Sequence, residues 1–111
     1  MDAVHDDSPP LLVVTTLATR EQALALGREM VERRLAACAQ VDAIDSIYRW
    51  QGAVEQDTEF RLLLKTRPAL YTRLEAALRE RHPYKLPAIH AIATVQAEAA
   101  YAAWVQDSTQ P

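Results

Sequence analysis

The first ordered segment of the chain is predicted at residues 11–17, which form a short apolar run rich in β-forming residues. An unbroken apolar run is typical of a central strand that is covered on both faces. Thr19 then offers a hydroxyl at a helix start, and Gln22 completes a capping box three residues later. The spacing predicts that the buried face of this helix consists of Leu24, Gly27, Met30, Val31 and Leu35.

Two long β-type runs follow, at residues 38–50 and 58–66. Both exceed the roughly five or six residues of an average strand, so we predict a protruding hairpin. Gln51 and Gly52 form the expected turn, since glycine adopts a positive φ without steric cost. The alternation of apolar and polar residues is disturbed around Asp42 and Ala43, which favours a β-bulge there.

A second helix is predicted to begin at Pro68, because proline suits the first turn, where its missing N–H is not needed. It should end at His82 and Pro83. Residues 87–95 are predicted to form another strand, followed by a short C-terminal helix. The buried faces of the two helices are expected to contain Leu70, Leu74, Ala77 and Leu78, and Tyr101, Trp104 and Val105.

The element order is therefore βαββαβ with a terminal helix, which indicates an α+β, ferredoxin-like sandwich with a long central hairpin. We expect a flexible leader at residues 1–10, a single domain at 11–106 and a polar tail at 107–111. In this fold both main helices cover the same face of the sheet. The other face needs a cover that one chain does not supply, so we expect an oligomer.

Composition narrows the class of protein. The 111 residues carry 12 basic and 15 acidic side chains, a net charge of −3, with both signs scattered along the chain. This balance argues against nucleic acid and anionic membranes as partners. The single cysteine, Cys38, cannot form an internal disulfide, and the acidic start does not resemble a signal peptide. We therefore expect a cytoplasmic protein with no membrane segment.

The sequence contains no recognisable catalytic motif. Its two glycines exclude a glycine-rich phosphate loop, and no nucleophile-elbow motif is present. The acidic pairs Glu29–Glu32 and Glu55–Asp57 have no neighbours that would raise a carboxyl pKa, so they are interpreted as a solvated helix face and a turn.

Five short motifs then follow one another along the chain: Arg34-Leu35-Ala36-Ala37-Cys38, Ser46-Ile47-Tyr48-Arg49-Trp50-Gln51-Gly52, Leu63-Leu64-Lys65-Thr66, His82-Pro83-Tyr84 with Pro87, and Tyr101-Ala102-Ala103-Trp104. In this order and spacing they resemble the CutA family of divalent-cation tolerance proteins, over about residues 11–106. The resemblance implies a ferredoxin-like homotrimer in which long hairpins complete neighbouring sheets. It further implies a non-catalytic role in tolerance of copper and other divalent metal ions.

The chain departs from the family pattern at a few positions. Lys85 and Ala88 stand where many members are acidic, and the second strand is one residue shorter near residues 42–43. In enterobacterial members, copper binding is attributed to a cysteine and two histidines. The matching residues here are Thr15, Arg81 and His82, so one metal ligand of three remains.

His82 is thus the candidate ligand for copper or another divalent cation, with a local hydrogen-bonding role as the ordinary alternative. Copies of His82 or His90 from other subunits would have to complete such a site. Cys38 is interpreted as a packed thiol and His90 as an interface residue.

A second candidate site is a cleft between subunits, lined by Tyr48, Trp50, Lys65 and Tyr84, which could take a small molecule or anion. The alternative interpretation is that the aromatic rings anchor the subunit interface. This cleft also supports an alternative function, a trimeric ligand-sensing module resembling PII-type signalling proteins.

Overall fold

The computed structural model describes residues 8–111, and residues 1–7, most of the predicted leader, lie outside the described part. Residues 8–111 fold into four strands, three α-helices and one 3₁₀ turn. In order these are β1 (Leu11–Leu17), α1 (Arg20–Glu32), β2 (Cys38–Trp50), β3 (Ala53–Thr66), η1 (Pro68–Leu70), α2 (Tyr71–Arg81), β4 (Ile89–Ala93) and α3 (Ala99–Ser108).

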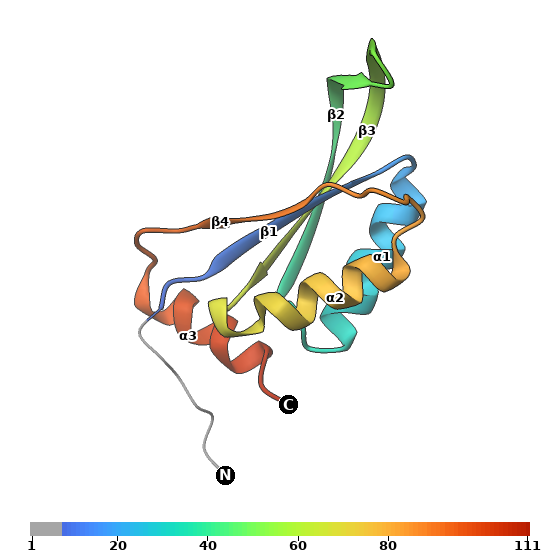
Figure 1. Ribbon diagram of the computed structural model, residues 1–111. Coiled ribbons are helices and arrows are strands. Elements are labelled where there is room, and N and C mark those ends of the chain that lie inside the picture. Colours follow the sequence, from blue (N-terminus) through green and yellow to red (C-terminus); the bar gives the residue numbers. More distant parts are fainter. Residues whose placement is uncertain (1–7) are drawn as a thin grey trace.

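The strands form one antiparallel sheet with the order β2-β3-β1-β4, and the helices lie on one side of it (Figure 1). This arrangement confirms the predicted α+β, ferredoxin-like fold. Strand β1 is central and pairs with β3 on one side and β4 on the other. Strands β2 and β4 are therefore the two edges of the sheet.

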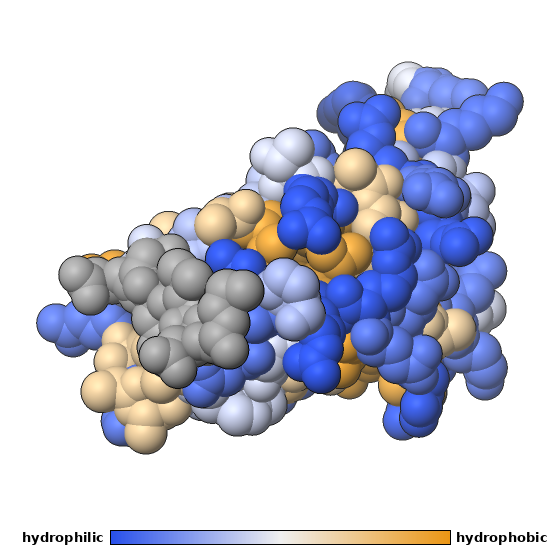
Figure 2. Space-filling view, turned by 90° about the horizontal axis from the view of Figure 1, so that it is seen from below, coloured by the Kyte–Doolittle hydropathy of each residue, from blue (hydrophilic) through white to orange (hydrophobic). Residues whose placement is uncertain are grey.

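The hydrophobic core lies between the helices and the facing side chains of the sheet, including Val13, Leu62 and Leu64, which are fully buried. Thr19 caps α1 as predicted, because its hydroxyl oxygen accepts a hydrogen bond from the Gln22 N–H at 3.1 Å. The predicted face of α1 was partly wrong, since Leu24 is 47% exposed. The residues of α1 that face the sheet are Ala23, Leu26, Gly27 and Met30. Seen from the helix side, the surface is mostly hydrophilic, with a smaller apolar area at its centre (Figure 2).

The β2–β3 hairpin is continuous from Cys38 opposite Lys65 to Trp50 opposite Ala53. The predicted bulge at Asp42 and Ala43 is wrong, because no residue is skipped along this register. The change in sequence pattern instead marks the point where the strands leave the body of the sheet. The turn is as predicted, with φ of +48° at Gln51 and +83° at Gly52.

Strand β1 pairs with β3 only from Phe60 onwards, so residues 44–59 form an arm that pairs only with itself (Figure 1). The molecule is consequently elongated, measuring 52 × 26 × 21 Å. Its radius of gyration is 15.0 Å. A compact chain of this length would have a value of about 13 Å, so the arm adds much of the extension.

Element boundaries differ from prediction in four places. Helix α2 begins at Tyr71 rather than Pro68, because residues Pro68–Leu70 form the 3₁₀ turn η1. Strand β3 begins at Ala53 rather than Thr58, and β4 covers only Ile89–Ala93 of the predicted residues 87–95. Helix α3 runs two residues into the predicted polar tail. Thr109 beyond it is buried and accepts a hydrogen bond from the Arg67 side chain at 3.1 Å. This contact explains why the end of the chain packs against the domain.

No helix or strand of residues 8–111 covers the sheet face opposite the helices. Alternation along the strands places Leu12, Val14, Leu63 and Ile92 on this open face. Val14 is buried by its neighbours, whereas Ile92 is 48% exposed. The open face therefore combines apolar side chains with solvent contact.

The close approach of α1 to the sheet yields a stability prediction. A Cβ at Gly27 would lie 2.9 Å from the Ala39 Cβ and 3.0 Å from Leu62 Cδ1. Overpacking of this kind costs about 1–3 kcal/mol, against a helix-propensity gain of about 1 kcal/mol for alanine. We expect Gly27→Ala to lower the free energy of unfolding in urea. The control is Ala25→Gly, on the exposed side of the same helix, which measures the effect of helix propensity alone. A Gly27→Ala variant that is more stable than the wild-type chain would contradict the close packing.

Candidate functional site

Two of the three positions that the family resemblance connects with metal, Thr15 and His82, come together where α2 ends beside β1. His82 is the C-cap of α2 and is buried. Its Nε2 lies 3.1 Å from Thr15 Oγ1 and 2.9 Å from the backbone oxygen of Thr16. Its Nδ1 accepts a hydrogen bond from the Tyr84 N–H at 3.1 Å. The imidazole thus ties the loop after α2 to the central strand.

These hydrogen bonds define the protonation of His82. Because Nδ1 accepts from an N–H, the proton of the neutral ring is on Nε2, which donates to the Thr16 carbonyl. Burial lowers the pKa of His82, although the hydrogen bond to Thr16 acts in the opposite direction. Both ring nitrogens are therefore engaged, and the ring can bind a metal ion only by giving up one of these bonds.

The other two positions do not supply metal ligands. Thr15 is fully buried and offers only a hydroxyl. The Arg81 Nε donates to Glu29 Oε2 at 3.1 Å, and Arg33 donates to the same oxygen at 3.1 Å. These arginines lower the pKa of Glu29, Arg81 most strongly. Residues 15, 81 and 82 therefore do not fit copper within one chain, and within residues 8–111 no group of three His, Cys, Asp or Glu side chains is arranged for a metal ion.

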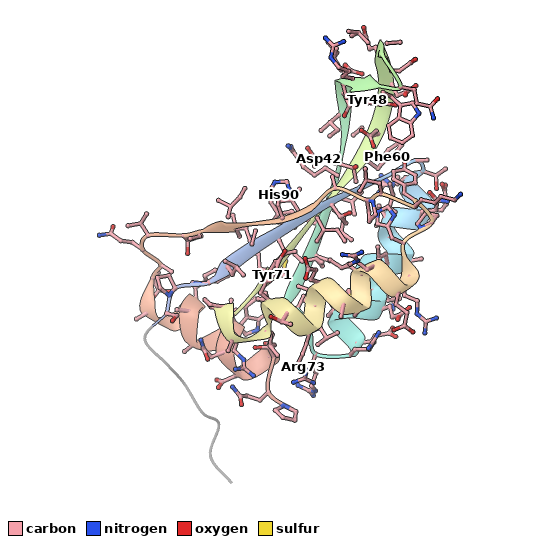
Figure 3. All side chains as sticks on the ribbon, viewed as in Figure 1. Asp42, Tyr48, Phe60, Tyr71, Arg73 and His90 are labelled. Carbon is pink, nitrogen blue, oxygen red and sulfur yellow. The ribbon has the colours of Figure 1, made fainter. Side chains whose placement is uncertain are left out.

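Three of the four predicted cleft residues meet in one groove of about 1050 Å³. Tyr48 and Trp50 come from the hairpin arm, and Tyr84 comes from the loop between α2 and β4. Tyr48 projects from the arm in Figure 3. The groove is lined by Thr16, Ala18, Asp45, Ser46, Ile47, Tyr48, Trp50, Asp57, Thr58, Glu59, Tyr84, Lys85, Leu86 and Ala88.

Carboxylates dominate the electrostatics of this groove. The Tyr48 hydroxyl donates a hydrogen bond to Asp57 Oδ2 across the hairpin. This bond, together with burial and the nearby charges of Asp57, Glu59 and Glu55, raises the pKa of Tyr48 to about 12. Burial raises the pKa of Tyr84, and the charges of Glu59 and Asp57 raise it further. Both phenols remain neutral hydrogen-bond donors at physiological pH.

Lys65 lies elsewhere in the same chain. It is opposite Cys38 near the other end of β3, and its Nζ lies 5.7 Å from the centroid of the Tyr101 ring. Tyr101 in turn stacks on Trp104, with centroids 5.9 Å apart. One chain therefore does not bring Lys65 to Tyr48, Trp50 and Tyr84, and their meeting across subunits stays a prediction.

Cys38 and His90 are not part of either cluster. Cys38 is a half-buried free thiol at the start of edge strand β2. His90 lies opposite Val14, on the open face, and is exposed; in Figure 3 it lies on the side of β4 away from the helices. No residue among 8–111 forms a hydrogen bond with the His90 ring, so its nitrogens remain available to a ligand.

Sequence reasoning missed the acidic side of the groove. Glu55 and Asp57 were expected in a turn, but both lie within β3. The signal was present, because Glu55, Asp57 and Glu59 follow one another with period 2 and so share one face of the hairpin with Tyr48, which is opposite Glu55. Leu86, which is 76% exposed at the rim, carried no recognisable pattern.

Comparison with known proteins gives one consistent result. Residues 11–108 match the family described as "CutA1 divalent ion tolerance protein". The divalent-cation tolerance protein CutA of Thermus thermophilus is 36% identical over 99 residues, which cover 88% of this chain and 96% of that protein. The CutA of Thermotoga maritima is also 36% identical, over 98 residues covering 88% and 97%.

Solved structures agree with this result. CutA from Synechococcus elongatus superposes with a TM-score of 0.90 at 33% identity, covering 96% of this chain and 95% of that one. CutA1 from Ehrlichia chaffeensis gives a TM-score of 0.89 at 31% identity, covering 96% and 100%. Sequence and structure together show that the chain belongs to the CutA1 divalent ion tolerance protein family.

Proposed function

We propose that this protein is a non-catalytic homotrimer that acts in the tolerance of divalent metal ions, copper among them. The observation that carries the proposal is the family match, which extends over residues 11–108. Relatives from several organisms are named divalent-cation tolerance proteins. The matches favour this function over the PII-like sensing module considered from the sequence.

The open face supports the proposed trimer. An apolar face that combines Leu12, Leu63 and a half-exposed Ile92 gains stability when a second sheet covers it. Edge strands β2 and β4 also lack partners on their outer sides within the chain. Because the two edges differ, a pairing between them is heterologous, and such a pairing closes into a ring under three-fold symmetry.

The hairpin arm gives a second line of support. An isolated two-stranded hairpin is marginally stable in water. Residues 44–59 nevertheless extend beyond the sheet with Ile47 at 69% and Val54 at 64% exposure. Packing of the arm against neighbouring copies would bury these side chains.

The helices of the described residues include none long and apolar enough to cross a membrane. Some relatives are named as chloroplastic or periplasmic proteins, so the names of relatives do not fix a location for this chain. The cytoplasmic location expected from the sequence is part of the proposal.

The proposed role predicts a growth phenotype. Deletion of the gene in its native host should reduce growth at elevated copper, because the tolerance function is lost, and expression of the wild-type chain should restore it. Growth with added sodium sulfate serves as the control for general ionic stress. Equal copper sensitivity of the deletion strain and its parent would contradict the role.

The trimer predicts a change in mass when the open face is charged. Ile92→Glu would bury a carboxylate in the subunit contact, which is strongly unfavourable without a partner. We expect light scattering to give three subunits for the wild-type chain and fewer for this variant. Ile92→Val, which keeps the face apolar, should remain trimeric, and a wild-type mass of a single subunit would overturn the trimer.

Copper binding should depend on His90 rather than His82. His90 is exposed on the open face, where three copies can approach one another, and imidazole is a good copper ligand. The His82 nitrogens are already engaged. In calorimetric titrations with copper, we expect a saturable signal that His90→Gln removes and His82→Gln leaves in place.

The opposite dependence, with binding lost in His82→Gln and retained in His90→Gln, would show that the ion breaks the hydrogen bonds of the buried ring. The unfolding temperature of both variants should be measured beside the wild-type chain, because loss of the His82 bonds alone lowers stability.

A further inference from the structure

The groove at the base of the hairpin arm has a chemistry that the proposed metal tolerance does not use. It lies between the arm and the loop at residues 84–88. Its volume of about 1050 Å³ is at the upper end of the range for small-molecule sites. The question is which class of molecule its side chains would recognise.

Charge favours a cation. The groove contains the carboxylates Asp45, Asp57 and Glu59 and a single ammonium group, that of Lys85. Neither Glu59 nor Lys85 is ion-paired with another described residue. The charges of Asp57 and Glu59 act on both phenols of the groove, since they contribute to the raised pKa of Tyr48 and of Tyr84. An anionic ligand would meet net repulsion.

The aromatic rings favour an organic cation over a metal ion. Tyr48 is 39% exposed and Trp50 is 50% exposed, and Tyr84 closes the other side of the groove. Aromatic faces attract organic cations, with tryptophan the strongest. A divalent metal ion instead needs several oxygen ligands at one point. No such cluster occurs among residues 8–111.

We propose that this groove binds a small organic cation of the quaternary or alkylated ammonium class, held by the faces of Tyr48, Trp50 and Tyr84 and by the carboxylates of Asp57 and Glu59. The apolar Leu86 at the rim suits the methyl groups of such a ligand. The site is independent of the proposed role in metal tolerance.

The probe is choline chloride, titrated with EDTA present so that no metal effect enters. A Trp104→Phe background leaves Trp50 as the single tryptophan, so its fluorescence reports the groove directly. We expect saturable quenching by choline. The neutral isostere 3,3-dimethyl-1-butanol should bind at least about fivefold more weakly, because it lacks the charge that the rings and carboxylates attract.

Variants separate the contributions. By calorimetry in the wild-type background, Trp50→Leu should weaken choline binding about tenfold. Asp57→Asn and Glu59→Gln should each weaken it about two- to fivefold, a range typical of exposed charge pairs. Lys85→Gln should strengthen it, since it removes the opposing charge. Glu80→Gln, an exposed helix position outside the groove, is the matched control and should leave it unchanged.

Three results would overturn the proposal. One is equal binding of choline and its neutral isostere. Another is weaker choline binding in Lys85→Gln, which would indicate an anion site. The third is absence of choline binding by the wild-type chain. If Asp57→Asn then also gave a mass below that of three subunits, a cationic side chain of a second copy would be shown to fill the groove. Tyr48→Phe is the control for Asp57→Asn, because it removes the same hydrogen bond and keeps both the ring and the carboxylate. An effect seen in Asp57→Asn alone is therefore not caused by loss of that bond.

Discussion

The packing of α1 and α2 against one face of the sheet is the interaction on which the rest of the molecule depends. It buries Val13, Leu62 and Leu64 and brings α1 within van der Waals reach of β2 at Gly27. The same packing is one-sided, so it leaves an apolar second face and two free sheet edges. The proposed assembly with other copies of the chain follows from this asymmetry.

The region around His82 is organised by hydrogen bonds, and among residues 8–111 no set of His, Cys, Asp or Glu side chains is arranged there for a metal ion. Thr15 and His82 meet at the end of α2 and form a hydrogen-bonded connection between a loop and the central strand. Arg81 is turned to Glu29 on α1. The hydrogen bond from the Tyr84 N–H to His82 Nδ1 thus holds the loop that forms one wall of the groove.

Local signals made most of the fold predictable. The cap at Thr19, the turn at Gln51 and Gly52 and the stop at His82 are each specified by neighbouring residues. Prediction failed where the structure depends on parts of the chain that are distant in sequence. The pattern change near Asp42 arises because the strand leaves the sheet, and the separation of Lys65 from Tyr48 follows from their positions at opposite ends of a long hairpin. The acidic lining of the groove follows from the period-2 spacing of Glu55, Asp57 and Glu59 once the hairpin is taken to extend from its turn at Gln51 and Gly52.

The unbroken β2–β3 ladder has one further consequence. A slip of one residue anywhere along it would turn every side chain to the opposite face. The bidentate pair of Arg61 with Asp42, at 3.1 and 2.7 Å, lies where the body of the sheet becomes the arm. The register of β2 with β3 is thus fixed within the sheet and continues unchanged along the arm. The direction in which Tyr48 and Trp50 point is therefore set by residues of the sheet that these side chains never touch.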